Sequence, residues 1–257
     1  MKTLYTTQAI KNNRGRKYIL FPRDNAVTSS LYNNELYEPW LYEFLRVNEI
    51  TVEGTEIIDI GSNNGQIAIE FAHLVGDRGT VHAFEPQRVI FYQLCGNVFF
   101  NGQDNVLCNH MALGNYDGTT KVEKPDYFDK GFVNFGDVHV GKEFENYEIV
   151  QIKKLDSFKF SKVSVMKIDV QGFEIEVLNG AVNTINEHRP IIFIEIEEDQ
   201  LYRYGQTEES VINVLKDLNY TVNRFHEGKP FQTISGKCLD FVAVPNDRYD
   251  NEKIILI

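Results

Sequence analysis

The sequence predicts an α/β domain with a mostly parallel sheet, and three observations carry this prediction. From Thr55 onward, short apolar runs alternate with helical segments, which is typical of βαβ units. A glycine-rich turn, DIGSNNG at Asp59–Gly65, joins the first of these strands to its helix. The second strand ends in an acid, Glu85, within the sequence AFEP. In an open parallel sheet such strand ends meet at one edge, where ligands bind.

The first 50 residues precede this alternation and are expected to form a polar lead-in and a covering helix. The basic run KNNRGRK at 11–17 is short, and we expect a solvated arm rather than a nucleic-acid surface. The aromatic segment 34–48 predicts a helix with Pro39 in its first turn. Its apolar stripe consists of Leu36, Trp40, Leu41, Phe44 and Leu45. We expect this helix to cover the core or the ligand pocket.

Residues 51–257 are expected to form the main domain. Its predicted strands cover 55–60, 80–85, 105–113, 164–170, 189–196, 220–225 and 238–244. Its predicted helices cover 64–74, 88–100, 173–188 and 207–219, the last with Thr207 as its N-cap. The polar connection between the last two strands contains Gly and Pro and leaves no room for a crossover helix, so these strands should pair antiparallel.

The segment 114–155 interrupts the alternation, since it shows turn residues and strand-like pieces but no helix of useful length. An insertion this long inside an α/β domain is usually functional or disordered. Its phenylalanines favour order, namely Phe128, Phe132, Phe135 and Phe144. We therefore expect a β-rich flap over the substrate end of the sheet. Asn134 and His139 are its polar groups best placed to reach a substrate.

Composition narrows the classes of function. The net charge of −11 disfavours a nucleic-acid partner, because the phosphate backbone would be repelled. The three cysteines, Cys95, Cys108 and Cys238, lack the spacing of a disulfide framework or a zinc site. No apolar run approaches the roughly 18 residues that cross a bilayer. We expect a soluble, cytoplasmic protein with no membrane partner, and its oligomeric state stays open.

The residues of the Asp59–Gly65 turn indicate which class of nucleotide it could bind. A phosphate-binding Walker loop needs GxxxxGK[ST], but Gln66 and Ile67 follow Gly65. A dinucleotide fingerprint needs GxGxxG, whereas the spacing here is GxxxG and the carboxylate of Asp59 would repel a pyrophosphate. The same carboxylate would attract a cation or an ammonium group.

Glu85 adds the second part of the site. An acid at the end of the second strand can accept hydrogen bonds from both hydroxyls of a ribose. An acidic glycine turn with a ribose-binding acid suits S-adenosylmethionine, which is an adenosine with a zwitterionic amino acid, a positive sulfonium and no phosphate. Two structural alternatives stay open: Asp59 as a partner of the helix N-terminus, and Glu85 with Pro86 as a plain strand end.

Seven motifs in this order resemble the FkbM-type methyltransferases, a branch of the class I S-adenosylmethionine-dependent enzymes. The motifs lie within residues 55–244 and read IIDIGSNNGQ, VHAFEP, NVFFNG, MALGNYDG, KKLDSF, VMKIDVQGFEIEVLNGA and RPIIFIEI. The resemblance implies a three-layer Rossmann-like sandwich, with a seven-stranded, mostly parallel sheet whose last strand is antiparallel. It also implies methyl transfer, usually to a hydroxyl oxygen and often on a sugar or a sugar-bearing natural product.

The resemblance further implies which residues contact the cofactor. The methionine-binding loop corresponds to Asp59, Gly61, Ser62, Asn63, Asn64, Gly65 and Gln66. The ribose acid corresponds to Glu85, which Pro86 follows. The adenine side corresponds to Asn97 in the next helix and to Met111 and Ala112 after the third strand.

The fourth strand departs from the family pattern KxDxEGxE. The chain has Lys167, Asp169, Gln171, Gly172 and Glu174 at these positions. The amide of Gln171 can form hydrogen bonds but cannot take a proton or bring charge to a metal. Lys167 is expected to pair with a neighbouring acid, because buried lysines are seldom unpaired.

Methyl transfer to an alcohol requires positioning and a base within hydrogen-bond reach. Asp169, at the carboxyl edge of the fourth strand, is the leading candidate for the base or for orienting the acceptor, with helix capping as its structural alternative. Glu195 and Glu197, at the tip of the fifth strand, could bind a polyhydroxylated acceptor, hold a divalent cation or simply be solvated. His139 is the third catalytic candidate, with a structural role as the alternative. We assign no residue to a metal site.

The sequence therefore predicts an S-adenosylmethionine-dependent O-methyltransferase whose acceptor is a sugar-like or other small polar molecule or a glycan. Two other classes stay open. One is a nicotinamide-dependent oxidoreductase that uses the ribose acid. The other is a non-catalytic binding module on the same fold, which Gln171 suggests. RNA is a less favoured acceptor, because the chain is acidic and lacks interleaved basic and aromatic residues.

Overall fold

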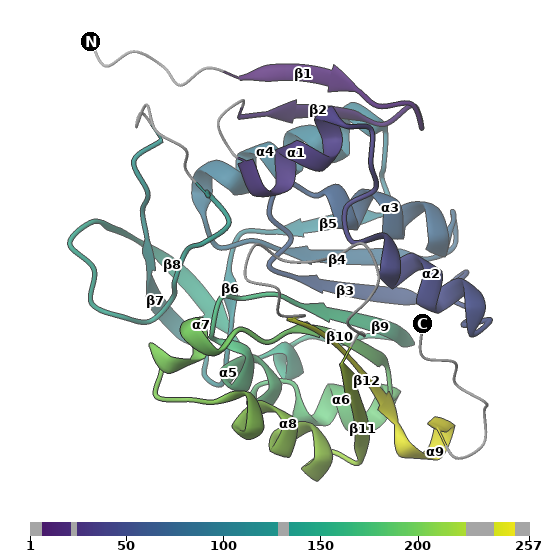
Figure 1. Ribbon diagram of the computed structural model, residues 1–257, viewed down its shortest axis with the longest axis vertical. Coiled ribbons are helices and arrows are strands. Elements are labelled where there is room, and N and C mark those ends of the chain that lie inside the picture. The colour runs from purple at the N-terminus through teal and green to yellow at the C-terminus, as the bar shows by residue number, and fades with distance from the viewer. Residues whose placement is uncertain (1–6, 22–24, 128–133, 225–238, 250–257) are drawn as a thin grey trace.

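The computed structural model describes residues 7–21, 25–127, 134–224 and 239–249. A central seven-stranded sheet has the order β11-β12-β10-β9-β3-β4-β5 (Figure 1). Its strands are β3 (Glu56–Ile60), β4 (Thr80–Phe84), β5 (Val106–Asn109), β9 (Val163–Ile168), β10 (Ile191–Glu195), β11 (Tyr220–Arg224) and β12 (Asp240–Pro245). β12 pairs antiparallel with β10 and β11, and the other pairs in this sheet are parallel. This topology confirms the predicted sheet, including its antiparallel last strand.

Helices cover both faces of the sheet and complete a three-layer sandwich (Figure 1). One face packs against α2 (Pro39–Val47), α3 (Gln66–Val75) and α4 (Arg88–Asn101). The other packs against α5 (Glu174–Asn179), α6 (Val182–His188) and α8 (Glu208–Asp217). Strand alternation decides which residue faces which layer, so Ile57 and Val165 lie in the first core and Ile58 and Met166 in the second. The shorter helices are α1 (Asn25–Tyr32), the 3₁₀ turn η1 (Leu155–Ser157), α7 (Glu198–Tyr202) and α9 (Asn246–Tyr249).

The N-terminal segment has more structure than the sequence predicts. β1 (Gln8–Lys11) and β2 (Lys17–Leu20) form an antiparallel hairpin, and the basic run covers the turn and the two strand residues that flank it. Most of the run is exposed, as predicted, but it is not a free arm, because Arg16 donates to the carboxylate of Glu70 in α3 at 3.1 Å and Arg14 lies 3.4 Å from it. Glu70 is buried, so these cations offset the cost of removing its charge from water.

The predicted covering helix is α2, with Pro39 in its first turn. Trp40 and Phe44 contact Phe193 of β10, with ring centroids 5.5 and 5.6 Å apart. These contacts hold the helix against the same face of the sheet as α3. The beginning of α2 therefore lies near the carboxyl ends of β9 and β10.

The single helix predicted over 173–188 is wrong, because the chain forms α5 and α6 instead. A side chain at Gly180 would place its Cβ 1.9 Å from a backbone oxygen, so the chain passes too close to its neighbour for a continuous helix. Asp156 then accepts hydrogen bonds from the backbone N–H groups of Asn183 (3.0 Å) and Thr184 (2.8 Å). This carboxylate satisfies the first N–H groups of α6 as a cap does.

A second, three-stranded sheet is formed by two strands of the flap and one short strand just before it. Its strands are β6 (Ala112–Leu113), β7 (Gly118–Glu123) and β8 (Tyr147–Lys153), in the order β6-β8-β7. The third predicted strand, 105–113, is therefore divided into β5 and β6, which belong to different sheets. Phe135 is buried, whereas Phe128 and Phe132 lie outside the described residues, as does Cys238.

Two glycines of the turn after β3 are required by packing. Gly61 has a φ of +83°, and a Cβ there would lie 1.8 Å from the carbonyl oxygen of Asp169. Gly65 has the same φ, and its Cβ would lie 2.6 Å from the side chain of Leu94. The turn thus approaches β9 and α4 more closely than any other residue type would permit.

Gly61→Ala should lower the free energy of unfolding by about 3 kcal/mol or more, because it adds a backbone clash to left-handed strain. Gly102 is the matched control, since its φ is +67° and nothing lies within 4 Å of a Cβ there. Gly102→Ala should cost only about 1 kcal/mol, the strain alone. Urea unfolding of both variants checks this, and equal losses would contradict the close approach.

Candidate active site

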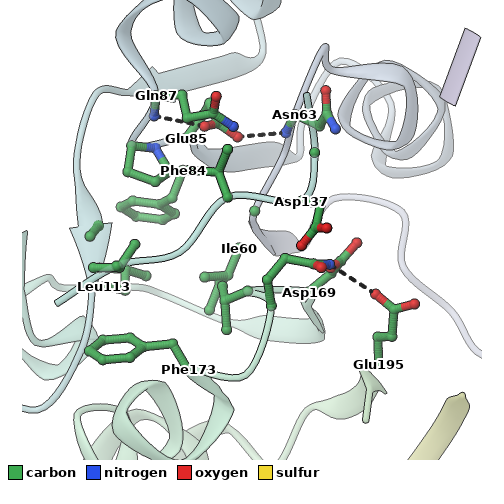
Figure 2. Close-up of a pocket in the computed structure, with 18 of the residues that line it drawn as sticks. Ile60, Asn63, Phe84, Glu85, Gln87, Leu113, Asp137, Asp169, Phe173 and Glu195 are labelled. Carbon is green, nitrogen blue, oxygen red and sulfur yellow. Dashed lines mark hydrogen bonds between the residues drawn. The ribbon is translucent and has the colours of Figure 1, made fainter. Parts of the chain in front are cut away.

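A cavity of about 350 Å³ opens at the carboxyl ends of β3 and β9. This is where the strand order of the sheet reverses, the position at which open α/β sheets bind ligands. The turn after β3, the end of β4, the flap and the segment after β9 all contribute to its wall (Figure 2). The volume lies in the range of small-molecule sites.

The cavity wall is acidic at one end and apolar at the other. Five carboxyl groups line it, from Glu85, Asp137, Asp169, Glu195 and Glu197. Within the part of the chain that the structure describes, no Lys, Arg or His side chain lines it. The apolar wall comes from Ile60, Phe84, Pro86, Met111, Ala112, Leu113, Val138, Val140, Val170 and Phe173. Such a wall suits a ligand with an uncharged ring system and positive charge.

Glu85 lies at the end of β4 and is held by two backbone groups (Figure 2). The N–H of Asn63 donates to its Oε2 at 3.0 Å, and the N–H of Gln87 donates to its Oε1 at 2.8 Å. Each oxygen keeps a lone pair for a further donor. Burial raises the pKa of Glu85 to about 7, although both backbone hydrogen bonds act in the opposite direction.

The residues predicted for the cofactor site divide into two groups. Gly61, Asn63, Glu85, Pro86, Met111 and Ala112 line the cavity. Asp59, Ser62, Asn64, Gly65 and Gln66 do not line it and instead build the turn. The Ser62 hydroxyl donates to the Asp59 carbonyl at 2.8 Å, and the Gln66 N–H donates to the Asn64 side chain at 3.1 Å. These hydrogen bonds hold the backbone that Gly61 and Asn63 present to the cavity.

Asn97 also lies away from the cavity, although it was predicted on the adenine side. It is fully buried, its Nδ2 donates to the Asn64 carbonyl at 2.8 Å, and its Oδ1 accepts from the Ile19 N–H at 2.6 Å. Both polar atoms are therefore used to join the N-terminal hairpin to the turn after β3. The reason is the hairpin itself, whose strand β2 lies against α4 and forms hydrogen bonds with the Asn97 and Gln93 side chains.

Lys167 forms ion pairs with the buried acids next to the cavity. Its ammonium lies 3.1 Å from Asp169 Oδ2 and 3.6 Å from Glu38 Oε1, which confirms the expected pairing with an acid. Asp59 is the residue beside Lys167 in the neighbouring strand β3. Alternation puts these side chains on the sheet face that α2 covers, so Glu38, the N-cap residue of α2, meets them.

One ammonium cannot compensate several buried carboxylates, and the pKa shifts reflect this. Burial alone would raise the pKa of Asp169, but the Lys167 ammonium and hydrogen bonds lower it below its ordinary value. Burial raises the pKa of Asp59 to about 6 and that of Glu38 to about 8, with Lys167 opposing both shifts. Asp169 is therefore the carboxylate that Lys167 keeps ionised.

Glu195 completes the acidic end of the cavity (Figure 2). Gln171 lines the cavity as well. Gln171 Nε2 donates to Asp169 Oδ1 at 2.9 Å and lies 3.4 Å from Glu195 Oε2. Burial and then the charge of Asp169 raise the pKa of Glu195 well above its ordinary value. The amide that departs from the family pattern thus supplies an N–H donor between two acids, which a carboxylate could not.

His139 is buried behind the cavity wall rather than in it. Its Nδ1 lies 3.0 Å from Glu123 Oε2, and its Nε2 lies 2.7 Å from Gln200 Oε1. Gln200 Nε2 in turn donates to Asp137 Oδ1 at 3.0 Å. Both ring nitrogens are occupied, so the geometry fits the structural alternative, in which His139 joins the flap to α7 and helps to hold Asp137.

Several wall residues have no counterpart among the predictions. Gln87 follows the AFEP motif directly, and its Nε2 donates to the Phe135 carbonyl at 2.7 Å, which attaches the flap. Asp137 lies beside the predicted Asn134 and His139, so proximity in the flap could have suggested it. Tyr37 lies in the aromatic segment 34–48 that was expected to cover the core or the ligand pocket, but it was not part of the predicted apolar stripe.

The wall fits S-adenosylmethionine better than a phosphate-bearing nucleotide. Glu85 keeps acceptor capacity for ribose hydroxyls, the wall contains apolar residues for an adenine, and the remaining charge is negative. A pyrophosphate would meet five carboxyl groups and no cation among the described lining residues.

In the part of the chain that the structure describes, no group of three or more His, Cys, Asp or Glu side chains is arranged to hold a metal ion. None of the helices in the described residues is long and apolar enough to cross a membrane.

Comparison with known structures places this fold among methyltransferases. A putative rRNA methylase from Clostridium thermocellum matches with a TM-score of 0.50 and 13% identity, over 79% of this chain and 92% of that chain. An S-adenosylmethionine-dependent O-methyltransferase from Thermotoga maritima matches with a TM-score of 0.50 and 14% identity, over 93% of this chain and 77% of that chain. At such identities the likeness shows the fold alone.

The FkbM methyltransferase from Methylobacillus flagellatus KT matches with a TM-score of 0.47 and 15% identity, over 74% of this chain and 43% of that chain. The present chain therefore spans less than half of that protein. Comparison with curated proteins gave no match. The family model of the FkbM methyltransferase domain matches residues 59–222 of this chain, which is more than half of its length. The chain thus belongs to the FkbM methyltransferase family and is a methyltransferase of the class I fold, with S-adenosylmethionine as its cofactor.

Proposed function

We propose that the chain transfers a methyl group to a hydroxyl oxygen of a sugar-like or other small polar acceptor. The observation that carries this proposal is the acidic end of the cavity, where Asp169, Glu195, Glu197 and Asp137 face the space beyond Gly61. Carboxyl groups accept hydrogen bonds from hydroxyls, so several of them around one space suit an acceptor with several hydroxyls. The same end disfavours acceptors that carry phosphate or carboxylate.

The cofactor residues follow from the wall. We assign the ribose hydroxyls to Glu85, whose two oxygens are oriented by Asn63 and Gln87. Pro86, Met111 and Ala112 would contact the adenine, and the backbone of Gly61 would lie along the methionine part. When bound, S-adenosylmethionine supplies an electrophilic methyl group on a positively charged sulfur. The negative wall complements that charge.

Asp169 would act on the acceptor. It lies directly after β9, its carboxylate is ionised, and Lys167 and Gln171 hold its two oxygens. An acceptor hydroxyl that donates to Asp169 has its oxygen lone pair directed away from the carboxylate and toward the methyl group. Asp169 would take the hydroxyl proton when the acceptor oxygen receives the methyl group, while the methyl–sulfur bond would break and leave its electron pair on a neutral sulfur. Because the pKa of Asp169 is lowered, it is a weak base, and orienting the hydroxyl is its larger contribution.

The flap would exclude water from this end. Asp137, Val138 and Val140 line the cavity, and the flap is attached to the domain by hydrogen bonds at Gln87 and Gln200. Exclusion of water strengthens the electrostatic interactions of Asp169 and prevents hydrolysis of the cofactor.

The other interpretations lose their basis to different degrees. The family match assigns a methyltransferase and removes the nicotinamide-dependent oxidoreductase. The binding module rested on Gln171, and this side chain holds the carboxyl groups of Asp169 and Glu195 in place. RNA is disfavoured as an acceptor by the acidic wall. We also propose that the protein acts in the cytoplasm.

Labelled methyl transfer tests the proposal. Purified protein should transfer methyl from S-[methyl-³H]adenosylmethionine to at least one neutral sugar of a panel, with a mass increase of one methylene on oxygen. Asp169→Asn should lower kcat by about 100-fold or more while the cofactor dissociation constant changes little. Glu176→Gln is the control, because Glu176 lies on α5 outside the cavity wall. Transfer to nitrogen alone, or full activity of Asp169→Asn, would contradict the proposed chemistry.

A second prediction concerns the pH dependence of stability. The pKa of Glu85 is 4.5 in the unfolded reference and about 7 in the folded protein, so between these values the folded state binds more protons than the unfolded state. Stability from this group is therefore lost as pH rises through this window. Relative to the wild type, Glu85→Gln should gain up to about 3 kcal/mol of stability on going from pH 4 to pH 8.

Thermal or urea unfolding of the cofactor-free proteins measures this difference. Bound S-adenosylmethionine should reduce the loss in the wild type, because ribose hydroxyls donate to the ionised carboxylate. A difference between wild type and Glu85→Gln that does not change with pH would show that burial does not perturb Glu85.

A further inference from the structure

Tyr37 belongs to the wall of the proposed acceptor site although it lies outside the family's matched region, residues 59–222. It precedes α2 in the chain and lines the same cavity as Asp169, Gln171 and Glu195. A wall residue from outside the shared domain could determine which acceptor this chain binds and thereby distinguish it from its relatives.

The backbone holds Tyr37 in a defined direction. Glu38, the next residue, has a φ of +47°, a conformation that non-glycine residues rarely adopt, and Pro39 fixes the beginning of α2. The Glu38 carboxyl lies 3.6 Å from the Lys167 ammonium. Trp40 packs edge-on against Phe193 with ring centroids 5.5 Å apart. Strained backbone that is held by such surrounding contacts is typical of functional sites.

The hydroxyl of Tyr37 is suited to donate a hydrogen bond into the cavity. Burial, followed by the charges of Glu38, Asp169 and Glu195, raises its pKa well above the ordinary value of 10, so the phenol keeps its proton. It donates no hydrogen bond to any residue that the structure describes. The surrounding carboxyl groups accept hydrogen bonds from an acceptor, whereas Tyr37 can donate one to it.

We propose that Tyr37 is an acceptor-binding residue, which donates to the oxygen next to the hydroxyl that is methylated. The methylated hydroxyl donates to Asp169, and the neighbouring oxygen accepts from Tyr37. A vicinal diol, as on a sugar ring, offers both groups at the required separation. This inference rests on the proposed function and adds to it the class of acceptor, a neutral molecule with vicinal oxygens.

Tyr37→Phe tests the inference, because it keeps the ring and removes only the hydroxyl. With tritiated S-adenosylmethionine and a panel of neutral monosaccharides with and without vicinal diols, the variant should show a 3- to 10-fold higher KM for the preferred sugar, the loss of one hydrogen bond. The cofactor dissociation constant and the Tm should match those of the wild type. A 2-deoxy or O-methyl sugar that lacks the neighbouring hydroxyl should show no difference between the two proteins.

Tyr202→Phe is the matched control, since Tyr202 is 83% exposed on α7 and should leave KM unchanged. A wild type that methylates a sugar while Tyr37→Phe has the same KM would overturn the inference and leave the proposed function intact. A wild type that binds cofactor but neither methylates any sugar nor shows saturation-transfer NMR contact with one would overturn both. A rise in the cofactor dissociation constant instead of KM would assign Tyr37 to the cofactor and overturn its role toward the acceptor.

Discussion

Lys167 is the buried cation on which the chemistry of the cavity depends, and among the described residues no other Lys or Arg is buried. It lies in β9, the central strand at which the order of the sheet reverses. Its ammonium pairs with Asp169, so that one carboxylate stays ionised beside the cavity. Burial raises the pKa of Glu38, and burial followed by the charge of Asp169 raises that of Glu195, while Lys167 opposes both shifts. A single buried cation therefore keeps Asp169 able to accept a hydrogen bond from an acceptor hydroxyl.

The fold supplies this arrangement through strand alternation. Asp59, Lys167 and Glu195 point to the face that α2 covers, because each occupies the same phase of its strand. The turn after β3 can approach β9 only because Gly61 has no side chain. Gln171 Nε2 then donates to both Asp169 and Glu195, and this shared donor holds together two acids that would repel each other if both were charged. Packing, backbone conformation and charge thus act on the same few residues.

Local patterns in the sequence were sufficient to predict the sheet and one part of the site. Apolar runs between helical segments predict β3, β4, β9 and β10, and the residues after their carboxyl ends must then meet at one edge. This is why the sequence alone places Glu85 and Asp169 at the edge where the cavity lies. The antiparallel pairing of β11 and β12 followed from the composition of their connection.

The remaining features depend on contacts between distant residues, which no local pattern records. Asn97 was predicted to contact the adenine, but its side chain accepts a hydrogen bond from the backbone of Ile19, which is 78 positions away in the chain. The break between α5 and α6 depends on Asp156 and on the close passage at Gly180. Tyr37 reaches the cavity only because α2 packs on Phe193. Sequence reasoning therefore located the edge of the sheet that binds ligands but not the segments that other parts of the chain bring to it.

The most direct test of this account is the titration of Asp169 itself. Carbon-13 NMR of protein labelled at the aspartate carboxyl carbon, with Asp169→Asn used for assignment, should show Asp169 titrating below the ordinary aspartate value of 3.8. Replacing the cation in Lys167→Met should move that titration upward, because burial then acts on Asp169 without compensation. An Asp169 resonance that titrates above the ordinary value in the wild type, or one that does not move in Lys167→Met, would contradict the claim that Lys167 sets the charge of the site.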